Sequence, residues 1–134
     1  METFAKLAIL LNKLYRHYGT RKNNPDASAE LKSLFTGVYT AIRVGSQLVS
    51  NSKDTKVLSG LLEKEAKKYG ALVAAQPKPK GKAKQAPADY EQRGMLMGFE
   101  MLNRVVQGID KLDVNERFVL QDPVMEVPVE ALNL

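Results

Sequence analysis

Residues 31–49 read LKSLFTGVYTAIRVGSQLV, and their apolar side chains recur every three or four positions. That period is typical of a helix face that is buried against other helices. The members of this face are Leu31, Phe35, Val38, Ile42, Gly45 and Val49, with Leu34, Tyr39 and Leu48 beside them. The stretch therefore predicts a long buried helix around which the rest of the chain packs.

The segments on either side show the same period. Residues 3–18 predict a helix with one apolar stripe, whose members are Phe4, Leu7, Leu11, Leu14 and Tyr18. We expect Gly19 to end that helix and Asn24-Pro25 to begin the next one, because proline is tolerated at the first helical position. A third helix is expected from Asp54 to about residue 75.

Residues 76–88, QPKPKGKAKQAPA, contain three prolines, one glycine, four lysines and no large apolar residue. This composition predicts a linker. It separates a basic three-helix region, residues 1–75, from residues 89–121, where a long helix and then a short one are expected. The prediction is an all-α protein: a small helical bundle of three helices plus a fourth long helix after the basic linker, with an extended C-terminal tail over residues 122–134.

Charge is divided between the two halves of the chain. Residues 1–84 carry 16 Lys and Arg against 6 Asp and Glu, a balance of +10. Residues 85–134 carry 4 against 9, a balance of −5. A positive surface recruits phosphates or acidic partners and a negative one recruits basic surfaces, so the chain is expected to work through binding.

Two groups of cations are candidate contacts for nucleic acid or an acidic partner. The linker lysines are spaced every second residue, which spreads them over roughly 20 Å of extended chain and suits backbone phosphates; they are Lys78, Lys80, Lys82 and Lys84. The second group is Arg16, Arg21 and Lys22, next to His17. Alternatively, the lysines keep a linker extended, and the second group stabilises the negative end of a helix dipole.

The tail is a candidate docking segment because it would expose much apolar surface if it were free in water. Its apolar residues are Val124, Met125, Val127, Val129, Leu132 and Leu134. It is expected to fold back over its own bundle or to lie on a neighbouring subunit or partner. In the fourth helix, Gly94 and Gly98 are expected where another backbone approaches closely, with a tolerated defect as the alternative.

Catalysis finds little support in this sequence. The chain has no cysteine, and His17 is its single histidine, with no Ser, Asp or Glu at the spacing of a triad or metal motif. We therefore predict no enzyme, catalytic residue, cofactor or metal. No secretory signal and no run of roughly 20 apolar residues is present, which predicts a protein without a membrane span, in the cytoplasm or in a particle assembled there.

These observations favour a non-catalytic structural or assembly protein. It is expected to form a homo-oligomer or to dock into a larger complex through its C-terminal tail, as a viral or phage particle component does. One alternative is an accessory protein that binds DNA or RNA phosphates independently of sequence through the basic linker. Another is a helical adaptor or inhibitor of one protein partner.

Overall fold

The computed structural model describes residues 2–76, 87–111 and 123–127. They form a small all-α bundle, which confirms the predicted fold class. The α-helices of these residues are α1 (Glu2–Lys22), α2 (Ala29–Asn51), α3 (Thr55–Ala74) and α4 (Pro87–Gln107). Two 3-10 turns follow, η1 (Ile109–Lys111) and η3 (Pro123–Met125). No helix of the described ranges is long and apolar enough to cross a membrane.

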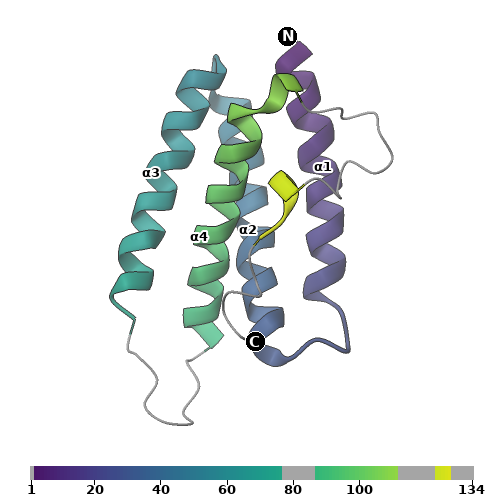
Figure 1. Ribbon diagram of the computed structural model, residues 1–134, viewed down its shortest axis with the longest axis vertical. Helices are drawn as coiled ribbons and strands as arrows, with labels where there is room; N and C mark the ends of the chain where they lie inside the picture. The colour runs from purple at the N-terminus through teal and green to yellow at the C-terminus, as the bar shows by residue number, and fades with distance from the viewer. Residues whose placement is uncertain (1, 77–86, 112–122, 128–134) are drawn as a thin grey trace.

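Helices α2 and α4 form the centre of the bundle and run in the same direction (Figure 1). Helix α1 packs on α2, and α3 packs on α4. Successive helices run antiparallel, but α3 touches α2 only slightly (Figure 1). The reason is that α4 occupies the position beside α2 that a simple three-helix bundle would give to α3.

Small residues set the contact between α2 and α4. A Cβ atom on Gly94 would overlap the carbonyl oxygen of Leu34, and one on Gly98 would lie 2.6 Å from the Cβ of Ala41. From α2, a Cβ on Gly37 would lie 2.9 Å from the Cα of Gly94. Because these positions need glycine for lack of space, the two backbones approach closely here, as in helix pairs built on small residues.

The core draws on every α-helix and on the C-terminal segment. Its large, fully buried side chains are Leu7, Leu10, Leu14, Tyr18, Leu34, Ile42, Leu58, Leu62, Phe99, Met101, Leu102 and Met125. Most of them belong to the apolar stripes that the sequence shows. Leu10 and Met101 lie outside those stripes, and Met125 comes from a segment with no helical period.

The first helix does not end at Gly19, as expected, but continues to Lys22. A Cβ atom on Gly19 would lie 3.2 Å from a ring carbon of Tyr39, so this glycine makes room for α2 instead of ending α1. The second helix does not begin at Asn24-Pro25 either. Ser28 is its N-cap, and the Ser28 hydroxyl accepts a hydrogen bond from the Leu31 amide at 3.1 Å.

The fourth helix begins at Pro87, so the last two residues assigned to the linker belong to α4, with proline in the first turn. It ends at Gln107, before the apolar stripe does, and Ile109 is buried from the 3-10 turn that follows. The expected short helix over residues 113–121 lies outside the described residues.

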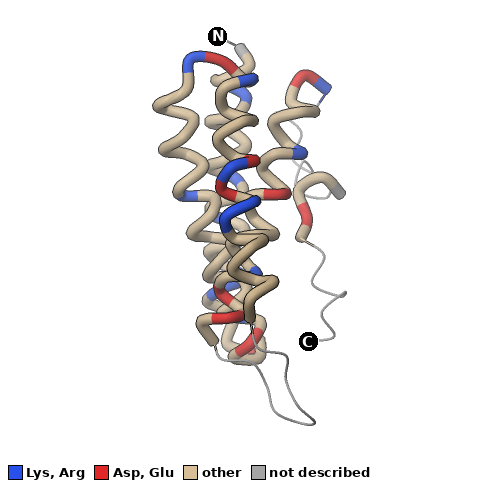
Figure 2. Tube along the Cα trace, turned by 90° about the vertical axis from the view of Figure 1, so that its left-hand side faces the viewer, with Lys and Arg blue, Asp and Glu red and all other residues tan. Residues whose placement is uncertain are grey.

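Helix α3 carries charges of both signs on its surface. Asp54 is its N-cap, and the Asp54 carboxylate accepts a hydrogen bond from the Val57 amide at 2.8 Å. Lys67 pairs with Glu63 one turn away, at 3.7 Å. Figure 2 shows positive and negative positions interleaved along this helix, the one nearest the viewer. The face of α3 that points away from the bundle is therefore a mixed, solvated surface.

Candidate functional site

The C-terminal segment, residues 123–127, packs against α1 and α4 (Figure 1), and we call the surface of these two helices that it covers the groove. Met125 is 1% exposed and Val127 is 6% exposed, while Val124 packs against the same core. The predicted extended tail is therefore a 3-10 turn over Pro123–Met125 followed by two non-helical residues. Of the two expected arrangements, this part of the tail has the one in which it folds back over its own bundle.

Each wall of the groove holds one carbonyl oxygen of the segment. From α1, the Tyr18 hydroxyl donates to the Met125 carbonyl at 2.8 Å, in a buried hydrogen bond. From α4, the Arg104 guanidinium donates to the Glu126 carbonyl at 3.2 Å. Main-chain hydrogen bonds combined with a buried side chain are the means by which grooves hold short peptides. The geometry is thus that of a peptide site occupied by the protein's own chain.

Burial controls the chemistry of Tyr18. Its ring is 2% exposed, and desolvation by burial raises the pKa of its hydroxyl to about 12, against the weaker opposing charge of Arg21. The hydroxyl is therefore neutral at physiological pH and remains a hydrogen-bond donor. The Met125 carbonyl keeps its partner throughout that range.

The charged groups beside the segment are complementary. The charge of the exposed Glu126 acts on His17 and Tyr18 of α1, and its main-chain carbonyl accepts the hydrogen bond from Arg104 of α4. Burial, with the charge of Arg21, lowers the pKa of His17 against the opposing effect of Glu126. His17 Nε2 accepts a hydrogen bond from Arg21 Nε at 2.9 Å, as a neutral imidazole can. The Tyr18 hydroxyl thus lies within the influence of one acidic residue of the segment and of the cationic Arg21 and Arg104.

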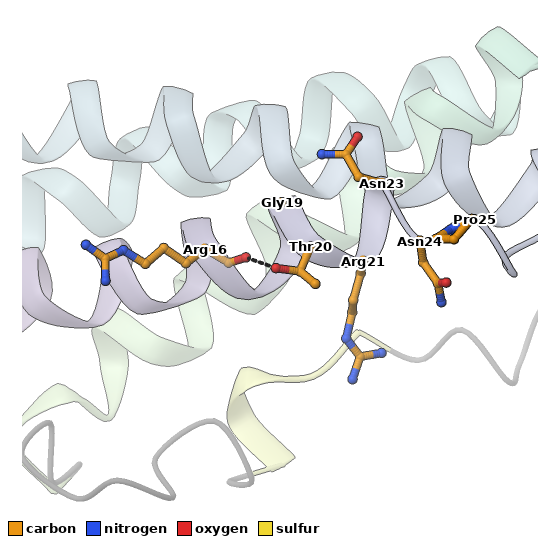
Figure 3. A pocket seen from close by; sticks show the side chains of 7 residues that line it. All are labelled: Arg16, Gly19, Thr20, Arg21, Asn23, Asn24 and Pro25. Atoms are coloured by element: carbon orange, nitrogen blue, oxygen red, sulfur yellow. Dashed lines mark hydrogen bonds between the residues drawn. The ribbon is translucent and has the colours of Figure 1, made fainter.

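The structure divides the basic group that the sequence placed at the end of α1. Figure 3 shows Arg16 extended along the helix, whereas Arg21 projects toward the C-terminal segment. Lys22 lies on a third flank, with its ammonium 4.8 Å from the centre of the Tyr39 ring. A surface hollow at this end of α1 is lined by Arg16, Gly19, Thr20, Arg21, Asn23, Asn24 and Pro25. Arg16 and Arg21 thus border one hollow although their side chains point in different directions, while Lys22 lies against the Tyr39 ring.

The remaining predicted site residues either pack inside the bundle or lie outside the described residues. Gly94 and Gly98 lie at the closest approach of α2 and α4. The linker lysines, Lys78, Lys80, Lys82 and Lys84, lie outside the described residues, as do Val129, Leu132 and Leu134 of the tail. Within the ranges that are described, no group of three or more His, Cys, Asp or Glu side chains is arranged to hold a metal ion.

The sequence reasoning missed Tyr18 and Arg104 as groove residues. Tyr18 was assigned to the apolar stripe, which is correct for its ring, but the stripe does not reveal the partner of its hydroxyl. Arg104 is exposed in the last turn of α4. The hydroxyl of Tyr18 could have indicated a contact, because a tyrosine hydroxyl that is buried usually requires a hydrogen-bond partner.

Comparisons of this chain with protein-family models, with curated proteins and with solved structures gave no match.

Proposed function

We propose that this protein is a non-catalytic structural component that assembles with copies of itself when the C-terminal segment of one copy occupies the α1–α4 groove of another. One observation carries the proposal: the groove binds residues 123–127 through two main-chain carbonyls and the buried Met125 side chain. None of these contacts depends on the segment and the groove belonging to the same chain. Exchange of such a segment is a low-cost route to oligomers.

The chain between η1 and η3 has the length that such an exchange needs. Eleven residues, 112–122, separate Lys111 from Pro123. A peptide of that length spans at most roughly 40 Å when it is extended, which is more than the width of a helix. The segment can therefore reach the groove of an adjoining copy.

Charge favours this contact between copies. The groove belongs partly to α1, in the half of the chain with a balance of +10, and the segment belongs to the half with a balance of −5. Opposite charges increase the rate of encounter and fix the orientation of docking. A reciprocal exchange closes a dimer, whereas a head-to-tail exchange continues into a ring or filament.

Two variants test the contributions of the groove and of the segment to assembly independently. In the segment variant, Met125→Glu places a charge at a fully buried position. In the groove variant, Tyr18→Phe and Arg104→Glu remove both hydrogen-bond donors while the size of the aromatic ring is kept. We expect the unaltered protein to show a multiple of the single-chain mass by light scattering and each variant alone to show a lower mass. An equal mixture of the two should recover a two-chain species, because one intact junction remains.

Leu72→Glu is the matched control for the segment variant, because Leu72 is a large apolar residue that is 40% exposed on α3. This control should leave the mass unchanged. A single-chain mass for the unaltered protein at every concentration would contradict the proposal. So would a mixture of the two variants that remains as separate chains while circular dichroism shows both to be folded.

A further inference from the structure

Helices α1 and α2 carry charge of essentially one sign. Residues 3–25 and 31–53 contain no Asp or Glu. The cations of these two stretches are Lys6, Lys13, Arg16, Arg21, Lys22, Lys32, Arg43 and Lys53. This differs from α3, where Lys and Glu alternate. A one-signed surface attracts a polyanion without the like-charge repulsion that interleaved carboxylates would add.

Two tyrosine rings lie among these cations, where α1 meets α2. The ring centres of Tyr15 and Tyr39 are 4.5 Å apart, and their planes are inclined at 35°. Tyr15 is 36% exposed. The Lys22 ammonium lies 4.8 Å from the centre of the Tyr39 ring, and the charge of Arg43 acts on the Tyr39 hydroxyl. We call this surface the α1–α2 seam and define it as Tyr15, Lys22, Tyr39 and Arg43.

Gly19 allows the Tyr39 ring to approach the backbone of α1 closely. A Cβ atom at this position would lie 3.2 Å from one carbon of the Tyr39 ring and 3.6 Å from another. The Tyr39 ring therefore rests directly on the backbone of α1, where it reaches Tyr15. A hydrogen bond with Tyr15, together with burial, raises the pKa of Tyr39, so the Tyr39 hydroxyl is neutral at physiological pH. The aromatic pair is thus ordered before any ligand binds.

The presence of aromatic rings beside the cations indicates which class of polyanion the seam would bind. An acidic peptide is held by cations and hydrogen-bond donors, and its carboxylates do not stack on a tyrosine ring. Single-stranded nucleic acid presents phosphates and also flat bases, which stack on aromatic side chains without regard to sequence. Duplex DNA offers phosphates but keeps its bases stacked inside.

We propose that the α1–α2 seam binds single-stranded nucleic acid independently of its sequence, with Lys22 and Arg43 against the phosphates and the Tyr15–Tyr39 pair under a base. This surface is on a different flank of α1 from the groove that holds the C-terminal segment. The binding is therefore separate from assembly, and either activity can fail without the other.

The test measures binding of the full chain to a fluorescent oligothymidine of about 20 nucleotides, a length that covers a site of ordinary size. Fluorescence anisotropy is recorded over a series of salt concentrations. For the double variant Lys22→Gln and Arg43→Gln, the slope of log K against log salt should become shallower by about 1.4, since each single-strand phosphate contact contributes about 0.7. The control, Lys56→Gln and Lys64→Gln, removes the same charge from α3 and should leave the slope nearly unchanged.

A second pair of variants tests stacking. Tyr15→Leu with Tyr39→Leu should weaken binding by about 5- to 100-fold, the range for loss of base–aromatic stacking. Tyr15→Phe with Tyr39→Phe should retain affinity, because the rings remain. Thermal unfolding of each variant verifies that it is folded, and the glutamine variants test the proposal even if the leucine variant does not fold.

The proposal fails if the unaltered protein does not bind the oligonucleotide at low salt. It also fails if the α3 control loses as much affinity as the seam variant, because binding would then follow total charge alone. Equal competition by polyglutamate of matched charge would assign the seam to an acidic protein. Binding to anionic vesicles without binding to the oligonucleotide would assign it to a membrane surface.

Discussion

Tyr18 joins the first helix to the C-terminal segment across 107 residues of sequence. Its ring belongs to the core, and its hydroxyl holds the Met125 carbonyl that would otherwise be buried without a partner. Loss of such a hydrogen bond costs about 1 kcal/mol, and more when a buried group is left unpaired. The position of this segment therefore depends strongly on one phenol group.

The raised pKa of Tyr18 gives the protein a pH dependence in the alkaline range. An unfolded tyrosine ionises near pH 10, whereas Tyr18 in the folded protein ionises near pH 12. The folded state thus binds the proton more tightly, so its contribution to stability is fully present below pH 10 and is lost as pH rises toward 12. Over those two pH units the loss reaches about 2.7 kcal/mol, at about 1.36 kcal/mol for each unit.

The measurement is the free energy of unfolding in urea between neutral and alkaline pH, compared with that of Tyr18→Phe. The unaltered protein should lose stability above pH 10 in excess of the variant, since the variant lacks the titrating hydroxyl. Parallel curves for the two proteins would show that Tyr18 is not buried against the segment.

The α2–α4 pair is the element on which the fold is built. Two parallel helices approach closely because glycine and alanine remove the side chains between them. Phe99 and Leu102 then reach into the core from α4, and Val38 and Ile42 do so from α2. A change in the spacing of this pair is expected to disturb the packing of both flanking helices.

Gly94→Ala tests that contact. The added methyl group would overlap the Leu34 carbonyl oxygen, which cannot rotate away because it belongs to the backbone of α2. We expect a loss of about 2–3 kcal/mol in the free energy of unfolding, at the upper end for overpacking of a core. Denaturation in urea, followed by circular dichroism, measures it.

Gly60→Ala is the matched control, because Gly60 is also inside a helix and no heavy atom lies within 4 Å of the position of its added Cβ. This variant should gain about 0.5–1 kcal/mol from helix propensity. A similar gain for Gly94→Ala would contradict the close approach of α2 and α4.

The sequence predicts the helices well and their ends and neighbours less well. Apolar periodicity identifies which face of a helix is buried, as it does for Leu7 and Leu14 in α1 and for Ile42 in α2. The period of the apolar residues does not show whether a glycine ends a helix or makes room for a neighbouring helix. Gly19 was expected to end a helix and Gly94 to make room for another backbone, yet both make room. Nor does the period place α4 between α2 and α3, because that arrangement follows from contacts between distant segments.

For the candidate site, the sequence singled out the apolar residues of the C-terminal segment but not the surface of α1 and α4 that covers them. Exposure of Met125 and Val127 to water would be unfavourable, and that argument alone required a cover for them. The identity of the cover depends on the polar tip of Tyr18 and on Arg104, which no spacing rule connects with residues 123–127. Of the cations predicted as one group near the end of α1, Arg16 and Arg21 border one hollow, whereas Lys22 lies against the Tyr39 ring.

At the scale of the whole molecule, the groove and its segment form a two-part interface inside one chain. The segment is the last part of the described chain and is joined to the bundle by residues 112–122. Under the proposed exchange, each contact that stabilises one chain would also join two chains. Assembly would then depend on the protein concentration.

Exchange of the segment between copies is most directly measured by the contact of Met125 with Tyr18 across two chains. One sample carries carbon-13 in its methionine methyl groups and another carries it in its tyrosine rings, and the two are refolded together from denaturant. We expect the assembled fraction to show a nuclear Overhauser effect between the Met125 methyl group of one chain and the Tyr18 ring of the other. A contact that is detected only when both labels are on the same chain would contradict the exchange.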